Sequence, residues 1–339
     1  MILSEVIFLF LNLFINFIIF KNFDQLKKLI SFYDVPNLSR KKHKVPVPVL
    51  GGVWILFNFF LTILYFTFFN ENLLIKSFFL DLREKVLILL FLTIFLIVGL
   101  YDDVNDIKYK QKSFIFLFLS FCLFYSNERL IIYSIKIILI DNINTFSLGK
   151  YSLLFIIFSF VFLLISLNFI DGINLNLGLF YLTNILLLFF LTKNVFFLYL
   201  VIPIVFILYL NYHSRIFFGD SGVYVITLIL TFFFIKHYNV GIVSFDKLFL
   251  IFLYPVVDCL RVILARLVTF KNLAVGDRNH FHHILDNKYG FSIAILIIVI
   301  KNLFLIFASF FLPPLFTIIL YIFVYLSIFF ICKRKVSLF

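Results

Sequence analysis

The feature that most constrains this chain is the recurrence of long apolar runs from one end to the other. Each run has about 17–25 residues, which is enough for a helix to cross roughly 30 Å of hydrocarbon. The chain is 64% hydrophobic, whereas a soluble domain is roughly half apolar. A transmembrane β-barrel is excluded because its strands of about 10 residues alternate in polarity, and these runs do not alternate. The sequence therefore predicts an all-α, polytopic integral membrane protein.

We expect about eleven membrane-spanning helices, all within one transmembrane domain that covers residues 1–339. The residues with recognisable chemistry fall between 34 and 285, and residues 286–339 supply C-terminal helices and a basic tail. Segment 127–150 has a mixed pattern, so a hairpin and a helix lying at the membrane interface both remain open for it. The expected spans are residues 2–20, 49–69, 85–101, 113–126, 151–167, 177–192, 195–212, 221–236, 247–265, 291–311 and 314–332.

The distribution of positive charge sets the expected orientation. Lys and Arg gather in the loop at 21–48 and in the later loops that the span count places on the same side of the membrane. Because cytoplasmic loops carry the excess of Lys and Arg, the N-terminus is expected outside and the C-terminus in the cytoplasm. Topology and anionic ligands together explain the net charge of +12, so nucleic acid is not expected as a partner.

Acidic residues and histidines gather on the same cytoplasmic face, although Lys and Arg alone set the topology. A channel would place polar residues along a pathway, and a transporter would place its site near the midplane of the membrane. Chemistry at one interface instead favours an enzyme that works where a lipid headgroup meets a soluble substrate. The residues expected on this face are Asp24, Asp34, Asp102, Asp103, Asp106, Asp171, Asp220, Asp258, Asp277, Asp286, His43, His213, His280, His282 and His283.

Four short segments at the span ends carry this chemistry, and three of them also have a simpler structural interpretation. The adjacent carboxylates of Asp102 and Asp103 repel each other at the end of an apolar run, so they need a reason to be there. Asp171 stands in an Asp-Gly turn, Asp220 could be only a helix N-cap, and 277–285 could be only a basic loop that faces anionic lipid. Taken together, these oxygen ligands suit Mg²⁺ and the nearby basic residues suit a polyanion, which predicts phosphoryl transfer.

The motifs that contain these residues resemble those of a known superfamily, the polyprenyl-phosphate N-acetylhexosamine-1-phosphate transferases. It includes the initiating GlcNAc-1-phosphate transferases of cell-envelope polysaccharides and the MurNAc-pentapeptide translocase of peptidoglycan synthesis. The resemblance is closer to the GlcNAc-type branch. The motifs, in chain order, are "DVPNLSRKKHKVPVPVLGG" (34–52), "YDDVNDIKYKQK" (101–112), "NFIDG" (168–172), "FGDSG" (218–222) and "PVVDCLRVILARL" (255–267) with "DRNHFHHIL" (277–285).

The resemblance implies a reaction in which a polyprenyl phosphate, typically undecaprenyl phosphate, attacks a UDP-sugar and UMP is released. It implies that Asp102 and Asp103 position or deprotonate the lipid phosphate. It also implies that Asp220 binds Mg²⁺, or Mn²⁺ in its place, with Asp171 supporting the metal or the substrate. The residues implied to hold the nucleotide, sugar or diphosphate are Asn168, Arg278, His280, His282 and His283, with His43, Lys110 and Lys112 as further anion contacts.

The chain departs from the usual motifs at a few positions that bear on the metal or on the substrate. Asn174 stands where a second Asp is usual, and Leu175 follows where Gly is usual. The split His-x-His-His pattern favours a small donor such as UDP-GlcNAc, followed by UDP-GalNAc or a deoxy-acetamido sugar. The alternatives are UDP-MurNAc-pentapeptide as donor, a multipass transporter, for which Lys301 inside a span is the main charged feature, and an inactive scaffold. The resemblance implies a bacterial inner membrane, and the apolar surface is compatible with a homodimer.

Overall fold

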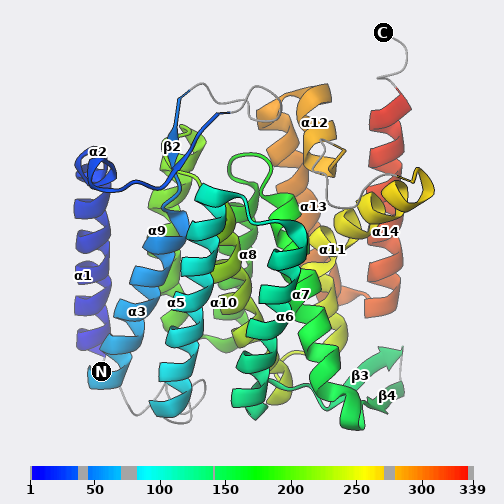
Figure 1. Cartoon of the computed structure of the whole chain (residues 1–339). Coiled ribbons are helices and arrows are strands. Elements are labelled where there is room, and N and C mark those ends of the chain that lie inside the picture. The colour runs from blue at the N-terminus through cyan, green and yellow to red at the C-terminus, as the bar shows by residue number, and fades with distance from the viewer. Residues whose placement is uncertain (1, 37–44, 70–81, 140–141, 271–278, 335–339) are drawn as a thin grey trace. The chain divides into compact units, whose positions relative to one another are not determined.

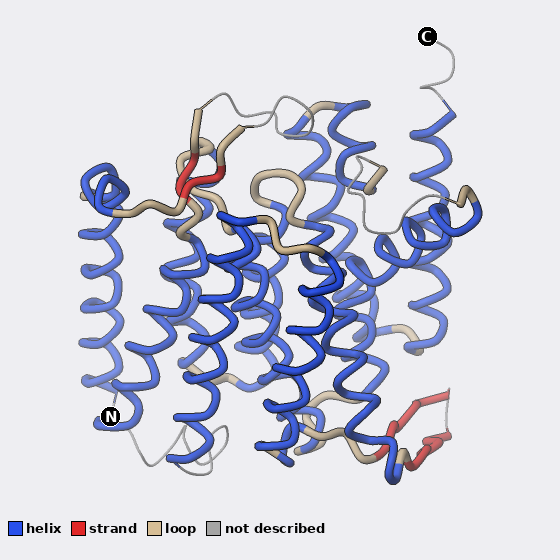
Figure 2. Tube along the Cα trace, viewed as in Figure 1, coloured by secondary structure: helices blue, strands red, loops and turns tan. Residues whose placement is uncertain are grey.

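The computed structural model describes residues 2–36, 45–69, 82–139, 142–270 and 279–334. Helices dominate it (Figure 1), and the strands of the described residues form two short hairpins (Figure 2). The predicted all-α membrane architecture is confirmed. The chain divides into two compact units, Met1–Lys112 with Leu177–Phe233 and Ser113–Asn176 with Phe234–Phe339. The predicted single domain stays a prediction.

The first unit is built on long apolar helices around the start of α10. Its strands β1 (Tyr33–Asp34) and β2 (Val47–Pro48) pair antiparallel. The N–H of Phe217 donates to the carbonyl of Pro48 at 3.0 Å, and the N–H of Gly51 donates to the carbonyl of Phe217 at 3.1 Å. These bonds hold the residues before α10 against the start of α3. The helices that contribute to this unit are α1 (Ile2–Lys21), α2 (Phe23–Leu26), α3 (Gly51–Phe69), α5 (Leu82–Asn105), α6 (Tyr109–Ser126, first turn), α8 (Asn176–Thr192), α9 (Phe196–Tyr212) and α10 (Gly219–Asn239).

Glycines let two helices of this unit, α3 and α5, approach the first turn of α10 at backbone distance. A Cβ added at Gly52 of α3 would lie 2.7 Å from the backbone nitrogen of Gly222. A Cβ added at Gly99 of α5 would lie 2.3 Å from the Cα of Ser221. Membrane helices pack closely where small residues meet, because apolar lipid provides no hydrophobic drive for association. The sequence therefore fixes α3 and α5 against the segment that carries Asp220.

A buried amide cluster joins α1 to α3 in the same unit. The side-chain nitrogen of Asn16 donates to the side-chain oxygen of Asn58 at 2.7 Å, and the indole N–H of Trp54 donates to Asn16 at 2.6 Å. Hydrogen bonds between membrane helices are worth roughly 0.6–2 kcal/mol each. The polar residues within these spans therefore serve helix association.

The second unit packs α11 (Phe245–Val268) against α7 (Ser152–Ile170), α13 (Phe291–Phe311) and α14 (Pro314–Arg334), with the short helix α12 (Phe281–Tyr289) against α13 and α14. The hydroxyl of Ser244 caps α11 by accepting from the N–H of Lys247 at 3.4 Å. Strands β3 (Ser134–Leu139) and β4 (Asn142–Ser147) form an antiparallel hairpin. Of the two interpretations left open for 127–150, the hairpin is the one confirmed.

Each of the eleven expected spans corresponds to a helix of the described residues, and the three that start at residues 49, 151 and 195 begin one or two residues before their helix. Eight of these helices are long and apolar enough to cross a membrane, and α8 and α9 are apolar but shorter. Helix α6 falls outside both groups because Lys110 and Lys112 lie in its first turn. A multi-pass membrane protein is therefore supported, while the orientation of the termini and the full number of crossings stay predictions.

Candidate functional site

In the first unit, the end of α5 meets the first turns of α6 and α10. The ammonium of Lys112 lies 2.6 Å from Oδ2 of Asp102 and 3.0 Å from Oδ2 of Asp220. The hydroxyl of Tyr224, one turn further along α10, donates to Oδ2 of Asp102 at 2.8 Å. We refer to Asp102, Asp103, Lys112 and Asp220 as the carboxylate–lysine cluster. Two carboxylates from separate helices thus converge on one cation.

Asp103 faces a different partner, the N-terminus of α10. Its Oδ1 accepts from the N–H of Asp220 at 2.7 Å, and its Oδ2 accepts from the N–H of Ser221 at 3.2 Å. Free amides at a helix N-terminus favour a carboxylate acceptor. The interpretation of Asp220 as the N-cap is therefore wrong: Asp103 caps α10 from another helix, and Asp220 lies inside the first turn. Gly219 makes this possible, since its φ is +63° and a Cβ there would lie 2.7 Å from both oxygens of Asp103.

The charge balance of the cluster keeps Lys112 protonated. Burial alone would lower the pKa of Lys112, but the carboxylates of Asp220 and Asp102 outweigh burial and raise that pKa above its ordinary value. The described residues contain no group of three or more His, Cys, Asp or Glu side chains placed to hold a metal ion. The donor set nevertheless fits Mg²⁺, which binds one or two protein carboxylates and completes its shell with phosphate oxygens and water. Asp102 and Asp220 provide two such carboxylates around a position already suited to positive charge.

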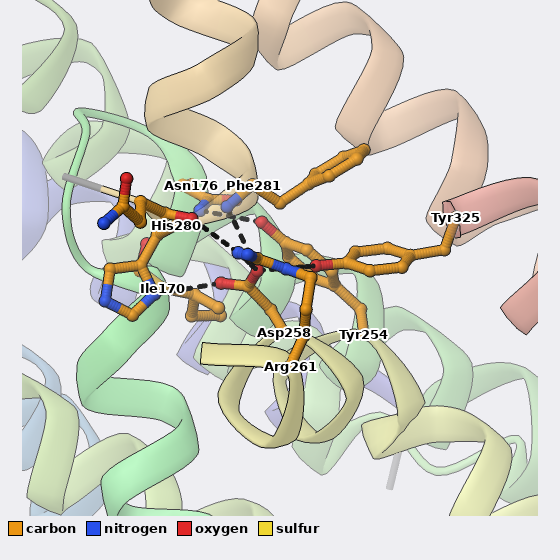
Figure 3. A network of polar contacts seen from close by, with 9 residues as sticks. Ile170, Asn176, Tyr254, Asp258, Arg261, His280, Phe281 and Tyr325 are labelled. Carbon is orange, nitrogen blue, oxygen red and sulfur yellow. Dashed lines mark hydrogen bonds and ion pairs between the residues drawn. The ribbon is translucent and has the colours of Figure 1, made fainter. Parts of the chain in front are cut away.

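The second unit contains a separate polar network around Asp258 of α11 (Figure 3). Asp258 is fully buried. Its Oδ1 accepts from the N–H of Phe281 at 3.0 Å and the hydroxyl of Tyr325 at 2.6 Å. The guanidinium of Arg261 lies 2.8 Å from the same oxygen, and Nδ1 of His280 lies 3.1 Å from Oδ2. One carboxylate therefore fixes the start of α12 through both the backbone and the side chain of its first residues.

The sequence interpretation did not identify Asp258 and Arg261 as site residues. Both lie in the quoted "PVVDCLRVILARL" stretch, three residues apart on α11, so they face the same side of that helix. This spacing was the available signal. Tyr325 carried no such signal, because it is one tyrosine in an apolar span near the C-terminus.

The turn after α7 contacts the histidines of α12 in this unit. A Cβ added at Gly172 would lie 2.1 Å from Nε2 of His282 and 2.9 Å from Nε2 of His283. Neither ring nitrogen of the buried His282 has a hydrogen-bond partner among the described residues. Burial, and then the neighbouring His283, hold the pKa of His282 well below its ordinary value. His282 is therefore a neutral imidazole, able to donate one hydrogen bond and accept another.

The same turn contains one residue with a strained backbone. Leu175 has a φ of +69°, in the left-handed region that favours glycine. Asn176 follows it and donates to the carbonyl of Ile170 at 2.7 Å and to the hydroxyl of Tyr254 at 3.2 Å. The buried side-chain amide of Asn176 thus closes the turn, and the backbone strain lies at Leu175.

The remaining predicted residues have the following positions. Asn168 is in the last turn of α7, and its carbonyl accepts from the N–H of Asp171, the C-cap residue, at 3.3 Å. Lys110 is exposed on α6. His43 and Arg278 lie outside the described residues. Asp171 belongs to the second unit and Asp220 to the first, so their joint binding of a metal stays a prediction.

Comparison with known families bears on this arrangement. Residues 86–238 match the family model described as glycosyl transferase family 4. The matched segment contains the whole carboxylate–lysine cluster and the turn at Asp171. No curated protein matches the chain. Residues 86–238 are therefore similar to glycosyl transferase family 4, a similarity that supports a polyprenyl-phosphate sugar-phosphate transferase in general.

Proposed function

We propose that this protein transfers N-acetylglucosamine 1-phosphate from UDP-GlcNAc to undecaprenyl phosphate at the cytoplasmic face of a bacterial inner membrane. The observation that carries the proposal is the carboxylate–lysine cluster within the family segment. It combines a charged lysine with three carboxylates at the ends of membrane helices. This is the chemistry needed where a lipid phosphate meets a nucleotide diphosphate.

The reaction makes and breaks one bond to phosphorus. An oxygen of the lipid phosphate bonds to the β-phosphorus of UDP-GlcNAc, and the bond from that phosphorus to the bridging oxygen breaks, so UMP leaves with the electron pair. Positioning and charge neutralisation dominate the catalysis of such transfers. Bound Mg²⁺ would supply positive charge to the diphosphate, with Asp220 and Asp102 as its protein ligands and Asp171 as a further candidate.

Each of the residues Lys112, Asp103 and Asp102 would then have its own role. Lys112 would exchange its contact with Asp220 for one with a substrate phosphate. Asp103 would hold the first turn of α10 in place, because both of its oxygens already accept backbone N–H groups. Asp102, oriented by the hydroxyl of Tyr224, would hold Lys112 toward the phosphates.

The histidines of α12 suit the sugar of the donor. His282 is neutral and buried, so it can pair with a hydroxyl or acetamido group without the cost of a buried charge. His283 follows it on the same short helix, and His280 is the N-cap residue of that helix. Three imidazoles suit a compact HexNAc better than a pentapeptide-bearing sugar, which needs contacts well beyond the ring.

The test is product formation by the purified protein in detergent with undecaprenyl phosphate and Mg²⁺. UDP-GlcNAc, UDP-GalNAc and UDP-MurNAc-pentapeptide are offered separately, and UMP and the lipid product are measured by mass spectrometry. We expect product from UDP-GlcNAc that disappears on adding EDTA and in Asp220→Asn. Asp24→Asn, at an exposed aspartate paired with Lys27 and Arg215, is the matched control and should retain activity.

Each other outcome has a defined meaning. Product from a different donor would correct the sugar and keep the reaction. A folded wild-type protein that releases no UMP from any donor would refute the proposal and leave the transporter or the scaffold. Equal activity in Asp220→Asn and Asp24→Asn would refute the role of the cluster.

A further inference from the structure

A buried lysine in the second unit takes no part in the chemistry described so far. Lys301 lies within α13, inside an apolar helix that is long enough to cross the membrane. Its side chain is 5% exposed, and its ammonium has no hydrogen-bond partner among the described residues. An ionisable residue inside a membrane span is costly to bury and commonly serves a function. Lysines near helix ends extend their ammonium to the interface instead, and Lys301 does not.

Four aromatic rings surround the ammonium of Lys301. The distances from Nζ to the ring centroids are 3.9 Å for Tyr254, 4.4 Å for Phe281, and 5.1 Å for both Tyr321 and Tyr325. We call these four residues the aromatic cage. A cation within about 6 Å of a ring centroid is attracted by the ring, and the attraction strengthens when water is excluded. The nearby carboxylate of Asp258 adds an electrostatic attraction.

Three rings of the cage, those of Tyr325, Phe281 and Tyr254, are linked to segments that carry candidate site residues (Figure 3). The hydroxyl of Tyr325 donates to Asp258, which also holds His280. Phe281 lies between His280 and His282 on the chain, and its N–H also donates to Asp258. Tyr325 of α14 and Phe281 at the start of α12 therefore both bind the carboxylate of Asp258, beside the cage.

The third ring extends this arrangement to the turn after α7. The hydroxyl of Tyr254 accepts from the side-chain nitrogen of Asn176. Asn176 donates in turn to the carbonyl of Ile170, the residue before Asp171. A single ammonium therefore contacts side chains that fix both the start of α12 and the Asp171 turn.

Packing alone does not account for a lysine here. A methionine has a similar length and fills apolar volume without the penalty of burying a charge. A methionine sulfur also contacts aromatic rings favourably, but it lacks the positive charge, which a ring attracts more strongly when water is excluded. The ammonium is the feature that draws elements α11, α12 and α14 together around one point of α13.

We propose that Lys301 is a positioning residue, whose ammonium holds the aromatic cage closed and thereby places His280, His282 and the Asp171 turn for the sugar donor. The identity of the donor rests on the proposed function. The positions of the histidines do not, and they can be measured without any substrate.

The first test reads the histidine rings directly. Protein labelled with ¹⁵N only at histidine gives few ring signals, which single His→Gln variants assign. In Lys301→Met we expect the signals of His280 and His282 to shift and that of His213, in the first unit, to stay. Lys301→Arg keeps the cation and should restore most of the shift. Lys85→Met removes another buried lysine, which is bonded to Thr67 in the first unit. This variant should shift the signal of neither His280 nor His282.

The second test separates binding from chemistry in the transfer assay. Lys301→Met should raise KM for UDP-GlcNAc roughly tenfold, with a smaller effect on kcat, because displaced contacts to the donor weaken its binding. Lys301→Arg should recover most of the loss. Unmoved histidine signals, an unchanged KM, or no difference between Met and Arg would overturn the proposal.

Two further outcomes are covered. If Lys301→Met does not give folded protein, Tyr321→Leu replaces it, because this change opens the cage without removing the charge or touching α12; unmoved His280 and His282 signals would then overturn the proposal. If the wild-type protein releases no UMP, the proposed function fails, and the histidine signals alone decide the role of Lys301.

Discussion

Replacing Gly99 by alanine tests how α5 positions the carboxylate–lysine cluster. A Cβ at this residue would lie 2.3 Å from the Cα of Ser221, 2.6 Å from its nitrogen and 3.0 Å from the carbonyl carbon of Asp220. All three are backbone atoms of the first turn of α10. No side-chain rotation can relieve the contact, so the two helices must separate.

The size of the effect follows from these distances. Ordinary contact with a Cβ begins at 3.4 Å, so the helices must move apart by about 1 Å. Overpacking of this kind costs about 1–3 kcal/mol. The bonds from Asp103 to the N–H groups of Asp220 and Ser221 stretch at the same time, and loss of a helix cap costs about 1 kcal/mol. A misplacement near 1 Å at a catalytic group lowers the rate by roughly 100-fold.

We therefore expect Gly99→Ala to be folded, less stable to heat in detergent, and about 100-fold slower in UMP release. The measurements are the thermal unfolding midpoint and the initial rate with UDP-GlcNAc. Gly178→Ala is the matched control: the atoms nearest to its Cβ would be the side-chain ends of Leu208 and Phe218, at 2.6 Å and 2.8 Å, rather than backbone. A Gly99→Ala protein that matches Gly178→Ala in rate and stability would show that α5 does not position α10 by backbone contact.

Three further predictions concern both units. Lys112→Met leaves two carboxylates facing each other without their cation, so it should destabilise the protein by about 3 kcal/mol and abolish UMP release; a stable, active variant would contradict the ion-pair geometry. Gly172→Ala places a Cβ 2.1 Å from His282, so it should weaken donor binding, seen as a raised KM, while leaving the lipid KM unchanged. The folded protein binds fewer protons at His282 than the unfolded chain does, so stability should fall as pH drops below about 6.5. His282→Gln should flatten that part of the stability–pH curve, and an unaltered slope would count against a buried neutral imidazole.

Much of the fold could be predicted because membrane spans depend on local composition. Hydrophobic length alone located helices at all the expected positions, since a bilayer leaves a spanning segment few alternatives to a helix. The hairpin at 134–147 was only one of two options, because its short strands resemble a partly buried helix in pattern. The ends of helices carried the clearest functional signal, since charges are rare elsewhere in such a chain.

The partners of those charges could not be predicted in the same way. Lys112 meets Asp220 across 108 residues of chain and Tyr224 meets Asp102 across 122, and motif order alone does not specify which atoms pair. Lys301 was recognised as unusual within its span. Its surroundings were hidden, because the rings of Tyr254 and Tyr325 look like any other aromatic residue in a chain with 54 Phe and 17 Tyr. Aromatic cages depend on three-dimensional proximity, which a biased composition obscures.

The adjacent aspartates at the end of α5, Asp102 and Asp103, have different partners and therefore different roles. Successive residues on a helix point about 100° apart, so the side chains of Asp102 and Asp103 point in different directions. Asp102 faces Lys112 and Tyr224, whereas Asp103 faces the amides that open α10. Each carboxylate thus has its own source of positive charge, a lysine in one case and a helix N-terminus in the other. These two sources of positive charge offset the repulsion between the carboxylates. Through these contacts the pair holds the end of α5 against the first turns of α6 and α10. The first turn of α10 carries Asp220, so the pair also positions Asp220 for a phosphate ligand.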